Sequence, residues 1–142
     1  MNVGTIKAAL PAAIVAALTS DPQGVTSTDQ VYFDDRPRPF NTAHSAEAWC
    51  FAPTDVLEPI EPMFGVTLYS WEVDVRVMSD DGSADLESWG DLLLDYFHAQ
   101  KVPSGLAGLI GSKAEIAYDL HPGEGYAKAV LCSIQFLGWR DK

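Results

Sequence analysis

The residues that most often carry chemistry are few in this sequence and are widely spread. The three histidines, His44, His98 and His121, are far from one another and from both cysteines, so none has the spacing of a metal-binding motif. Asp34 and Asp35 are adjacent, but adjacent acids in a turn are usually solvated rather than set up for acid–base catalysis. Motifs typical of nucleophilic, zinc and calcium sites are missing. The sequence therefore predicts no enzyme, no cofactor and no metal site.

The composition indicates one acidic globular domain. The chain has 142 residues, and 9 Lys and Arg against 20 Asp and Glu give a formal net charge of −11. A chain of about 100–200 residues is usually one domain, so we expect a single domain over residues 1–142. The negative charge argues against binding to a phosphate backbone. No apolar run reaches the roughly 18 residues of a membrane helix, so no membrane contact is expected.

The two cysteines, Cys50 and Cys132, both lie in apolar, strand-like runs. Two cysteines are too few for a disulfide framework, and buried free thiols behave as small apolar side chains. A single disulfide between neighbouring strands is the alternative. Free thiols are typical of a reducing compartment, which favours folding in the cytoplasm over secretion.

The first 20 residues fit two descriptions. Ile6, Leu10, Ile14 and Leu18 recur at helical spacing, which predicts an amphipathic helix that Thr5 can cap. A lysine followed by an alanine-rich apolar run also resembles a secretory signal, which would be removed from the mature protein. The single positive charge and the lack of a clear cleavage site favour the helix.

Further along the chain, the apolar residues alternate with a period of two. Within residues 66–78, every second residue from position 69 to position 77 is apolar: Tyr69, Trp71, Val73, Val75 and Val77. The residues between them include the charged Glu72, Asp74 and Arg76. This one-sided pattern is typical of an antiparallel sheet that is covered on a single face. Further strands are expected at 30–33, 46–51, 114–120 and 126–139, and a second helix from about residue 86 to residue 100. The expected order is α-β-β-β-α-β-β, which is an α+β fold with about five antiparallel strands and two helices packed on one face.

Two irregular segments, at about 34–45 and 53–65, combine prolines with apolar side chains. Proline has no amide donor and is unsuited to a central strand, so we expect both segments to be protruding arms. Exposed apolar side chains on arms are typical of interfaces. The residues predicted to contact another subunit or a tube are Arg36, Arg38, Phe40, Ile60, Met63 and Phe64. Alternatively, both arms fold back over the edge of the sheet and complete the core.

The second expected helix carries a line of acids, Glu87, Asp91 and Asp95, at a spacing of four residues. Like charges at this spacing repel one another slightly, so the line does not serve helix stability. Arg36 and Arg38 form the densest positive spot in the sequence. In a ring of identical subunits, these arginines are expected to pair with the acids of the neighbouring subunit.

Over its whole length, the chain resembles the tail terminator proteins of long-tailed bacteriophages, also called minor tail or tail-completion proteins, and related parts of gene transfer particles. The resemblance rests on the alanine-rich N-terminal helix, the strand at 31–33, the long strand at 69–77 followed by Asp81-Gly82, the helix at 89–97 and the closing hairpin that ends in Phe136-Leu137-Gly138-Trp139. It implies an α+β subunit of a homohexameric ring that caps the tail tube, ends its polymerisation and joins the tail to the head.

The same resemblance implies partners and a location. The partners are further copies of the chain, the tail tube protein and a head–tail connector or neck protein, and the site is the virion, assembled in the host cytoplasm. DNA would pass through the ring without specific binding, because like charges lower affinity for its backbone. The acids expected to face the pore are Glu72, Asp74, Glu87, Asp91 and Asp95.

Two other interpretations stay open. The first is another neck component, a head-closure or adaptor protein; those are usually small barrels or mainly helical. The second is a secreted acidic binding domain whose N-terminal signal has been cleaved.

Overall fold

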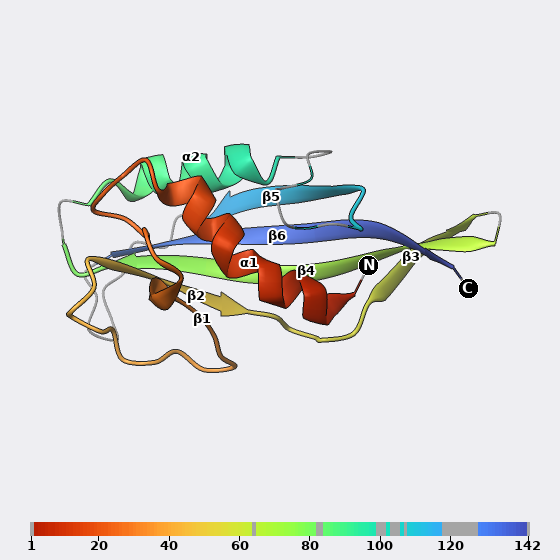
Figure 1. Ribbon diagram of the computed structural model, residues 1–142, viewed down its shortest axis with the longest axis horizontal. Helices are drawn as coiled ribbons and strands as arrows, with labels where there is room; N and C mark the ends of the chain where they lie inside the picture. Colours follow the sequence, from red (N-terminus) through yellow and green to blue (C-terminus); the bar gives the residue numbers. More distant parts are fainter. Residues whose placement is uncertain are drawn as a thin grey trace.

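The computed structural model describes residues 2–63, 65–81, 84–98, 102, 106, 108–117 and 128–141. These residues form two α-helices, a short 3-10 helix and a six-stranded sheet (Figure 1). The elements follow in the order α1 (Val3–Leu18), η1 (Thr28–Gln30), β1 (Val31–Phe33), β2 (Ala46–Phe51), β3 (Glu58–Met63), β4 (Val66–Ser79), α2 (Leu86–Tyr96), β5 (Gly111–Ala117) and β6 (Lys128–Asp141). The predicted α+β class with two helices is confirmed. The predicted turn at 121–125 lies outside the described residues.

The sheet is mixed and differs in two details from the expected one. Its strand order is β1-β2-β4-β6-β5, and β3 pairs with the remaining part of β4. All pairs are antiparallel except β1 and β2, which are parallel because the long segment 34–45 returns the chain to the same end of the sheet. The sequence pattern missed β3 because of Pro59 and Pro62. An edge strand that pairs on one side only can accommodate prolines, and β3 is such a strand.

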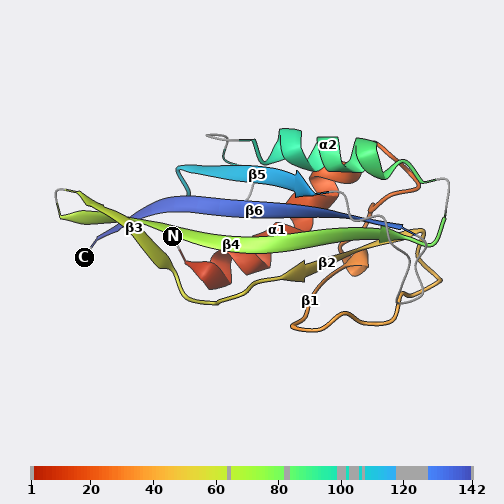
Figure 2. The same cartoon turned by 180° about the vertical axis from the view of Figure 1, so that it is seen from behind.

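Both helices lie on the same face of the sheet, and Figure 2 shows the opposite face in front of α1. The face beneath the helices carries Trp71, Val73, Val75 and Val77 of β4, all buried, as the alternation predicted. Phe136 of β6 stacks beside Trp71, with ring centroids 6.1 Å apart. The apolar side of α1 completes this core with Ile6, Leu10, Ala13, Ile14, Ala17 and Leu18. The segment that also resembles a secretory signal is thus a core helix.

Local contacts explain where the helices begin and how closely they pack. The cap of α1 is Asn2 rather than Thr5, since the Asn2 side chain accepts a hydrogen bond from the Gly4 amide at 2.8 Å. Asp85 caps α2, since its side chain accepts a hydrogen bond from the Ser88 amide at 3.1 Å, and α2 ends at Tyr96, before the expected end. Gly90 lets α2 approach β5 and β6, because a Cβ there would lie 3.3 Å from Ile116 and Val130 side chains.

The two cysteines are free and buried, and β4 separates them. Cys50 of β2 and Cys132 of β6 are both register partners of Val75, one on each side. Strands lie about 4.7–4.9 Å apart, so these two Cα atoms are roughly twice that distance from each other, beyond the reach of a disulfide. The disulfide alternative was therefore wrong. Burial raises the pKa of the Cys132 thiol to about 12, which keeps it protonated and unreactive.

Neither helix within the described ranges is long and apolar enough to cross a membrane.

Candidate functional site

The sheet face opposite the helices carries charged and aromatic side chains. On β4, Glu72 is exposed and Asp74 is half-buried, and the Asp74 Oδ1 atom accepts a hydrogen bond from the Ser133 hydroxyl at 2.7 Å. Two shallow hollows lie side by side here. One, of about 210 Å³, is lined by Glu72, Lys113, Glu115, Ser133 and Gln135, and the other, of about 100 Å³, by Trp49, Phe51, Asp74, Arg76 and Leu131. No group of acids, histidines and cysteines that could hold a metal occurs among the described residues.

The first arm, residues 34–45, folds over one end of this open face. Phe40 is only 8% exposed and packs in a small apolar cluster with Tyr32, Met78 and Ala129. The structure therefore places Phe40 in the interior of the chain's own fold and not on a protruding arm. For this segment the alternative prediction is correct: the arm folds back over the sheet and completes the core. It does so because the sheet offers an apolar surface that the chain crosses on its way from β1 to β2.

A buried carboxylate holds the first arm in place. Glu47 of β2 is 4% exposed, and its Oε1 atom accepts a hydrogen bond from the Asn41 amide at 2.9 Å. Its Oε2 atom lies 3.0 Å from Nδ1 of His44. A buried carboxylate needs such partners, because an unpaired buried charge is very costly. Glu47 thus anchors the far end of the arm to the sheet.

The two arginines of the first arm have different environments. The Arg38 guanidinium carbon lies 3.7 Å from the centre of the Tyr32 ring, and the Arg38 amide donates a 3.4 Å hydrogen bond to the Tyr32 hydroxyl. Burial raises the pKa of that hydroxyl. The Arg38 guanidinium is therefore engaged with Tyr32 of the same chain, although Arg38 and Arg36 are both exposed. Both predicted contact arginines are thus at the surface, and Arg38 is the one held against another side chain of the same chain.

The second arm, at about 53–65, projects from the body, with β3 and the facing part of β4 extending past both helices (Figures 1 and 2). Val56 is 72% exposed and Ile60 is 49% exposed. The base of the arm is fixed to the core, because the Trp71 indole donates a 2.6 Å hydrogen bond to the Thr54 carbonyl. The predicted contact residue Ile60 is thus at the surface. The side chain of Met63 and the whole of Phe64 lie outside the described residues.

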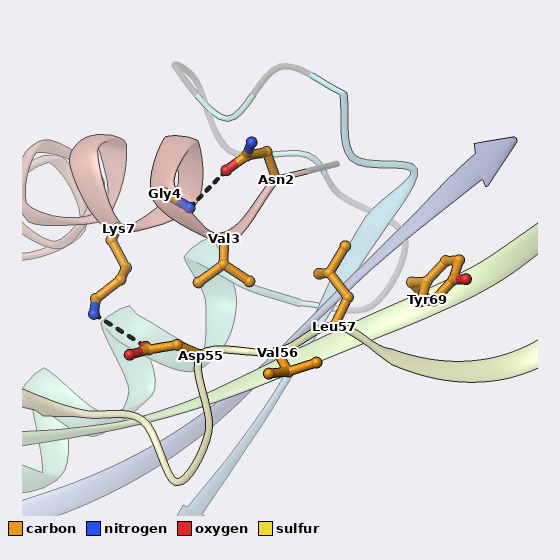
Figure 3. Close-up of a pocket in the computed structure, with 8 residues that line it drawn as sticks. All are labelled: Asn2, Val3, Gly4, Lys7, Asp55, Val56, Leu57 and Tyr69. Carbon is orange, nitrogen blue, oxygen red and sulfur yellow. Dashed lines mark hydrogen bonds and ion pairs between the residues drawn. The ribbon is translucent and has the colours of Figure 1, made fainter. Parts of the chain in front are cut away.

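A groove of about 560 Å³ lies between the start of α1 and the base of the second arm (Figure 3). At one side, Nζ of Lys7 forms an ion pair with Oδ1 of Asp55 at 3.1 Å. Figure 3 shows Val3 of α1 on one wall and the loop residues Val56 and Leu57 on the other. The groove was not predicted from the sequence. The signal for it was the apolar character of residues 56 and 57, which is unusual in a loop.

The five acids that were expected to face a pore fall into two groups. Glu72 and Asp74 lie on the open face of the sheet, whereas Glu87, Asp91 and Asp95 lie on the exposed side of α2, in the other layer of the fold. The two groups therefore point away from each other, and a single flat surface of the molecule can present only one of them.

No protein-family model matches this sequence, and no curated protein is significantly similar to it.

Proposed function

We propose that this protein is a structural subunit that assembles into a ring, of the kind that caps the tail tube of a long-tailed bacteriophage or a gene transfer particle. In this role it ends the growth of the tube and joins the tail to the head. The observation that carries the proposal is the projecting end of the sheet, which displays apolar side chains that a monomer leaves in water.

Ile60 and Trp139 mark this end, and a third large apolar side chain, Val56, lies at its base beside the groove. Val56 and Ile60 belong to the second arm, and Trp139 of β6, 36% exposed, pairs in register with Leu68 at the same end of β4. Aromatic and aliphatic side chains that gather on an exposed extension are typical of surfaces that become buried in an assembly. Two further features favour this proposal. The α+β fold differs from the small barrels and mainly helical folds that are usual in other neck components, and the two layers of the chain present different surfaces.

Different surfaces on opposite sides favour head-to-tail contacts, which close into rings when the rotation permits. The exposed side of α2 is acidic, and the first arm, on the opposite face, presents Arg36. In the proposed ring, Arg36 of one subunit pairs with the acids of α2 in the next. A tube contact through the projecting arm leaves this ring contact undisturbed.

The proposal is tested by the mass and shape of the purified protein. Light scattering after size-exclusion chromatography is expected to give about six times the 15.4 kDa of one chain, and negative-stain images are expected to show open rings. Added to polymerising tube subunits of its own particle, the protein should shorten the tubes. Ile60→Asp should abolish tube capping, whereas Glu58→Asp, a change in the same strand that keeps the charge, should not. Tubes of unchanged length in the presence of the wild-type protein would contradict the proposal.

A further inference from the structure

The open face of the sheet has an apolar area at each end, and the two areas differ in what covers them. At one end, Phe40 of the first arm packs with Met78 of β4 and Ala129 of β6 and is only 8% exposed. The other area, which we call the end patch, lies where the sheet extends past both helices (Figure 2). It consists of four apolar side chains on β4 and β6: Val66, Leu68, Leu137 and Trp139. None of the four belongs to the buried clusters that the described residues form, and Trp139 is 36% exposed.

The register of the strands fixes the face on which the end patch lies. β4 pairs with β6 without interruption, and Leu68 is opposite Trp139. Side chains alternate along a strand, so Leu68 lies on the same face as Glu72, whereas Trp71 lies beneath the helices. At the level of the end patch, the face that continues from beneath the helices carries the half-buried Tyr69. Each face of the projecting end therefore presents an aromatic side chain of its own.

Two exposed carboxylates border the end patch on the side nearest the body. Glu58 of β3 is opposite Ser70, and Glu72 follows Ser70 by two residues on the same face. Neither carboxylate has an ion pair or a hydrogen bond with any residue that the structure describes. Lys113, which lines a shallow hollow with Glu72, pairs instead with Glu115 at 3.3 Å. The border of the end patch is therefore negatively charged.

We propose that the end patch is the surface that the projecting end offers to the tube, and that it takes an apolar segment of a tube protein with a lysine or arginine beside it. This inference rests on the proposed function and assigns the tube contact to one face of the projecting end. An apolar centre with a charged rim is the usual anatomy of an interface, and complementary charges at the rim determine which partner binds and in which orientation. Because both acids lie on the side nearest the body, the basic group of the partner lies there too.

The chain itself covers its other apolar area with a segment of this kind. The first arm places Phe40 on that area and carries Arg36 and Arg38 shortly before it. The Arg38 guanidinium carbon lies 3.7 Å from the centre of the Tyr32 ring, so a cation lies beside the apolar contact. A tube segment with an apolar side chain and a nearby cation would repeat, between two proteins, a contact that is formed here within one.

Truncation of one aromatic side chain on each face tests the assignment. Trp139→Ala should raise the protein concentration that halves the tube length at least about tenfold, because central aromatic side chains carry much of the binding energy of an interface. Tyr69→Ala, at the same level on the other face, should raise it less than about threefold. Circular dichroism and urea unfolding check that both variants are folded. Full capping by folded Trp139→Ala protein, or an equal loss in Tyr69→Ala protein, would overturn the assignment.

Charge reversal tests the border with residues that are already exposed, so the variants are expected to fold. Glu58→Lys and Glu72→Lys should each raise the concentration for half-maximal capping about fivefold, whereas Asp29→Lys, an equal change in η1, should leave it unchanged. Raising the salt from about 50 mM to about 500 mM should weaken capping by the wild-type protein, because exposed charges are screened. The double variant E58K/E72K should lack this salt dependence.

The proposed function and this inference fail in different ways. If the wild-type protein leaves the tubes at full length, the proposed function is wrong, and the assignment of the end patch is wrong with it. If the wild-type protein shortens the tubes and E58K/E72K shortens them equally well at low salt, only the basic character assigned to the partner is overturned.

Discussion

The two proline-containing arms look alike in the sequence but have opposite environments in the structure. In the first arm, Phe40 is 8% exposed and packs on the open face of the sheet. In the second arm, Val56 and Ile60 are 72% and 49% exposed. Both arms combine prolines with apolar side chains, so composition does not account for the difference.

The path of the chain accounts for it. The first arm connects two parallel neighbours, β1 and β2, and has to return along the sheet, where Tyr32, Met78 and Ala129 provide an apolar surface beneath it. The second arm leads into β3, which pairs only with β4 and extends past the helices. Prolines thus show where regular pairing is interrupted, and the presence of an uncovered apolar surface nearby decides whether the segment is buried.

The sharpest test of this difference compares the same kind of truncation in both arms. Phe40→Ala should lower the free energy of unfolding by about 3 kcal/mol, because it removes a buried aromatic ring from a small cluster. Ile60→Ala should change it by much less, under about 1 kcal/mol, since that residue is already about half exposed. Urea unfolding followed by tryptophan fluorescence measures both. Equal losses in the two variants would remove the distinction between the arms.

A second test concerns the anchor of the first arm. Glu47→Ala leaves the Asn41 amide and the His44 ring without their acceptor, so a loss of about 2 kcal/mol is expected. Glu58→Ala, on the exposed side of β3, is the matched control and should be nearly neutral. Limited proteolysis at residues 36–45 should also become faster in the Glu47 variant only. Cleavage at the wild-type rate would show that the carboxylate does not hold the arm.

A third test uses pH. Burial raises the pKa of Tyr32 in the folded protein above its ordinary value near 10, so the unfolded chain loses this proton first as the pH rises. The contribution of Tyr32 to stability is therefore complete below about pH 10 and is lost as the pH rises towards the pKa of the folded state. Tyr32→Phe should lack this loss. The buried thiols add the same dependence to both proteins, so the difference between the two unfolding curves isolates Tyr32. Parallel curves up to pH 11 would contradict the prediction.

Much of the fold was predictable because the local pattern agrees with the final environment. The alternation along residues 66–78 specified which face of β4 is buried, and the spacing of Ile6, Leu10 and Ile14 specified the side of α1 that enters the core. β3 and the parallel pairing of β1 with β2 could not be predicted in this way. Both depend on which strands become neighbours, and that is decided by the path of the chain rather than by periodicity.

The candidate site was less predictable for the same reason. Residue type correctly indicated that Ile60 is exposed, because the strand containing it has no covering layer. It could not indicate that Phe40 has an apolar surface beneath it, or that Glu72 and Glu87 lie in different layers.

The smallest expected effect distinguishes the two arginines of the first arm. Arg38 lies over the Tyr32 ring at 3.7 Å, and an exposed cation–π contact contributes about 0.5–1 kcal/mol, so Arg38→Ala should lower the free energy of unfolding by that amount. Arg36→Ala should leave stability unchanged but weaken the proposed ring, because its partners are on another subunit. Arg38→Lys keeps the charge without the planar group and should recover only part of the loss. Unfolding curves and subunit mass measured on all three variants separate a contact inside the subunit from one between subunits. If Arg36→Ala destabilised the monomer as much as Arg38→Ala, the role assigned to Arg36 would be wrong.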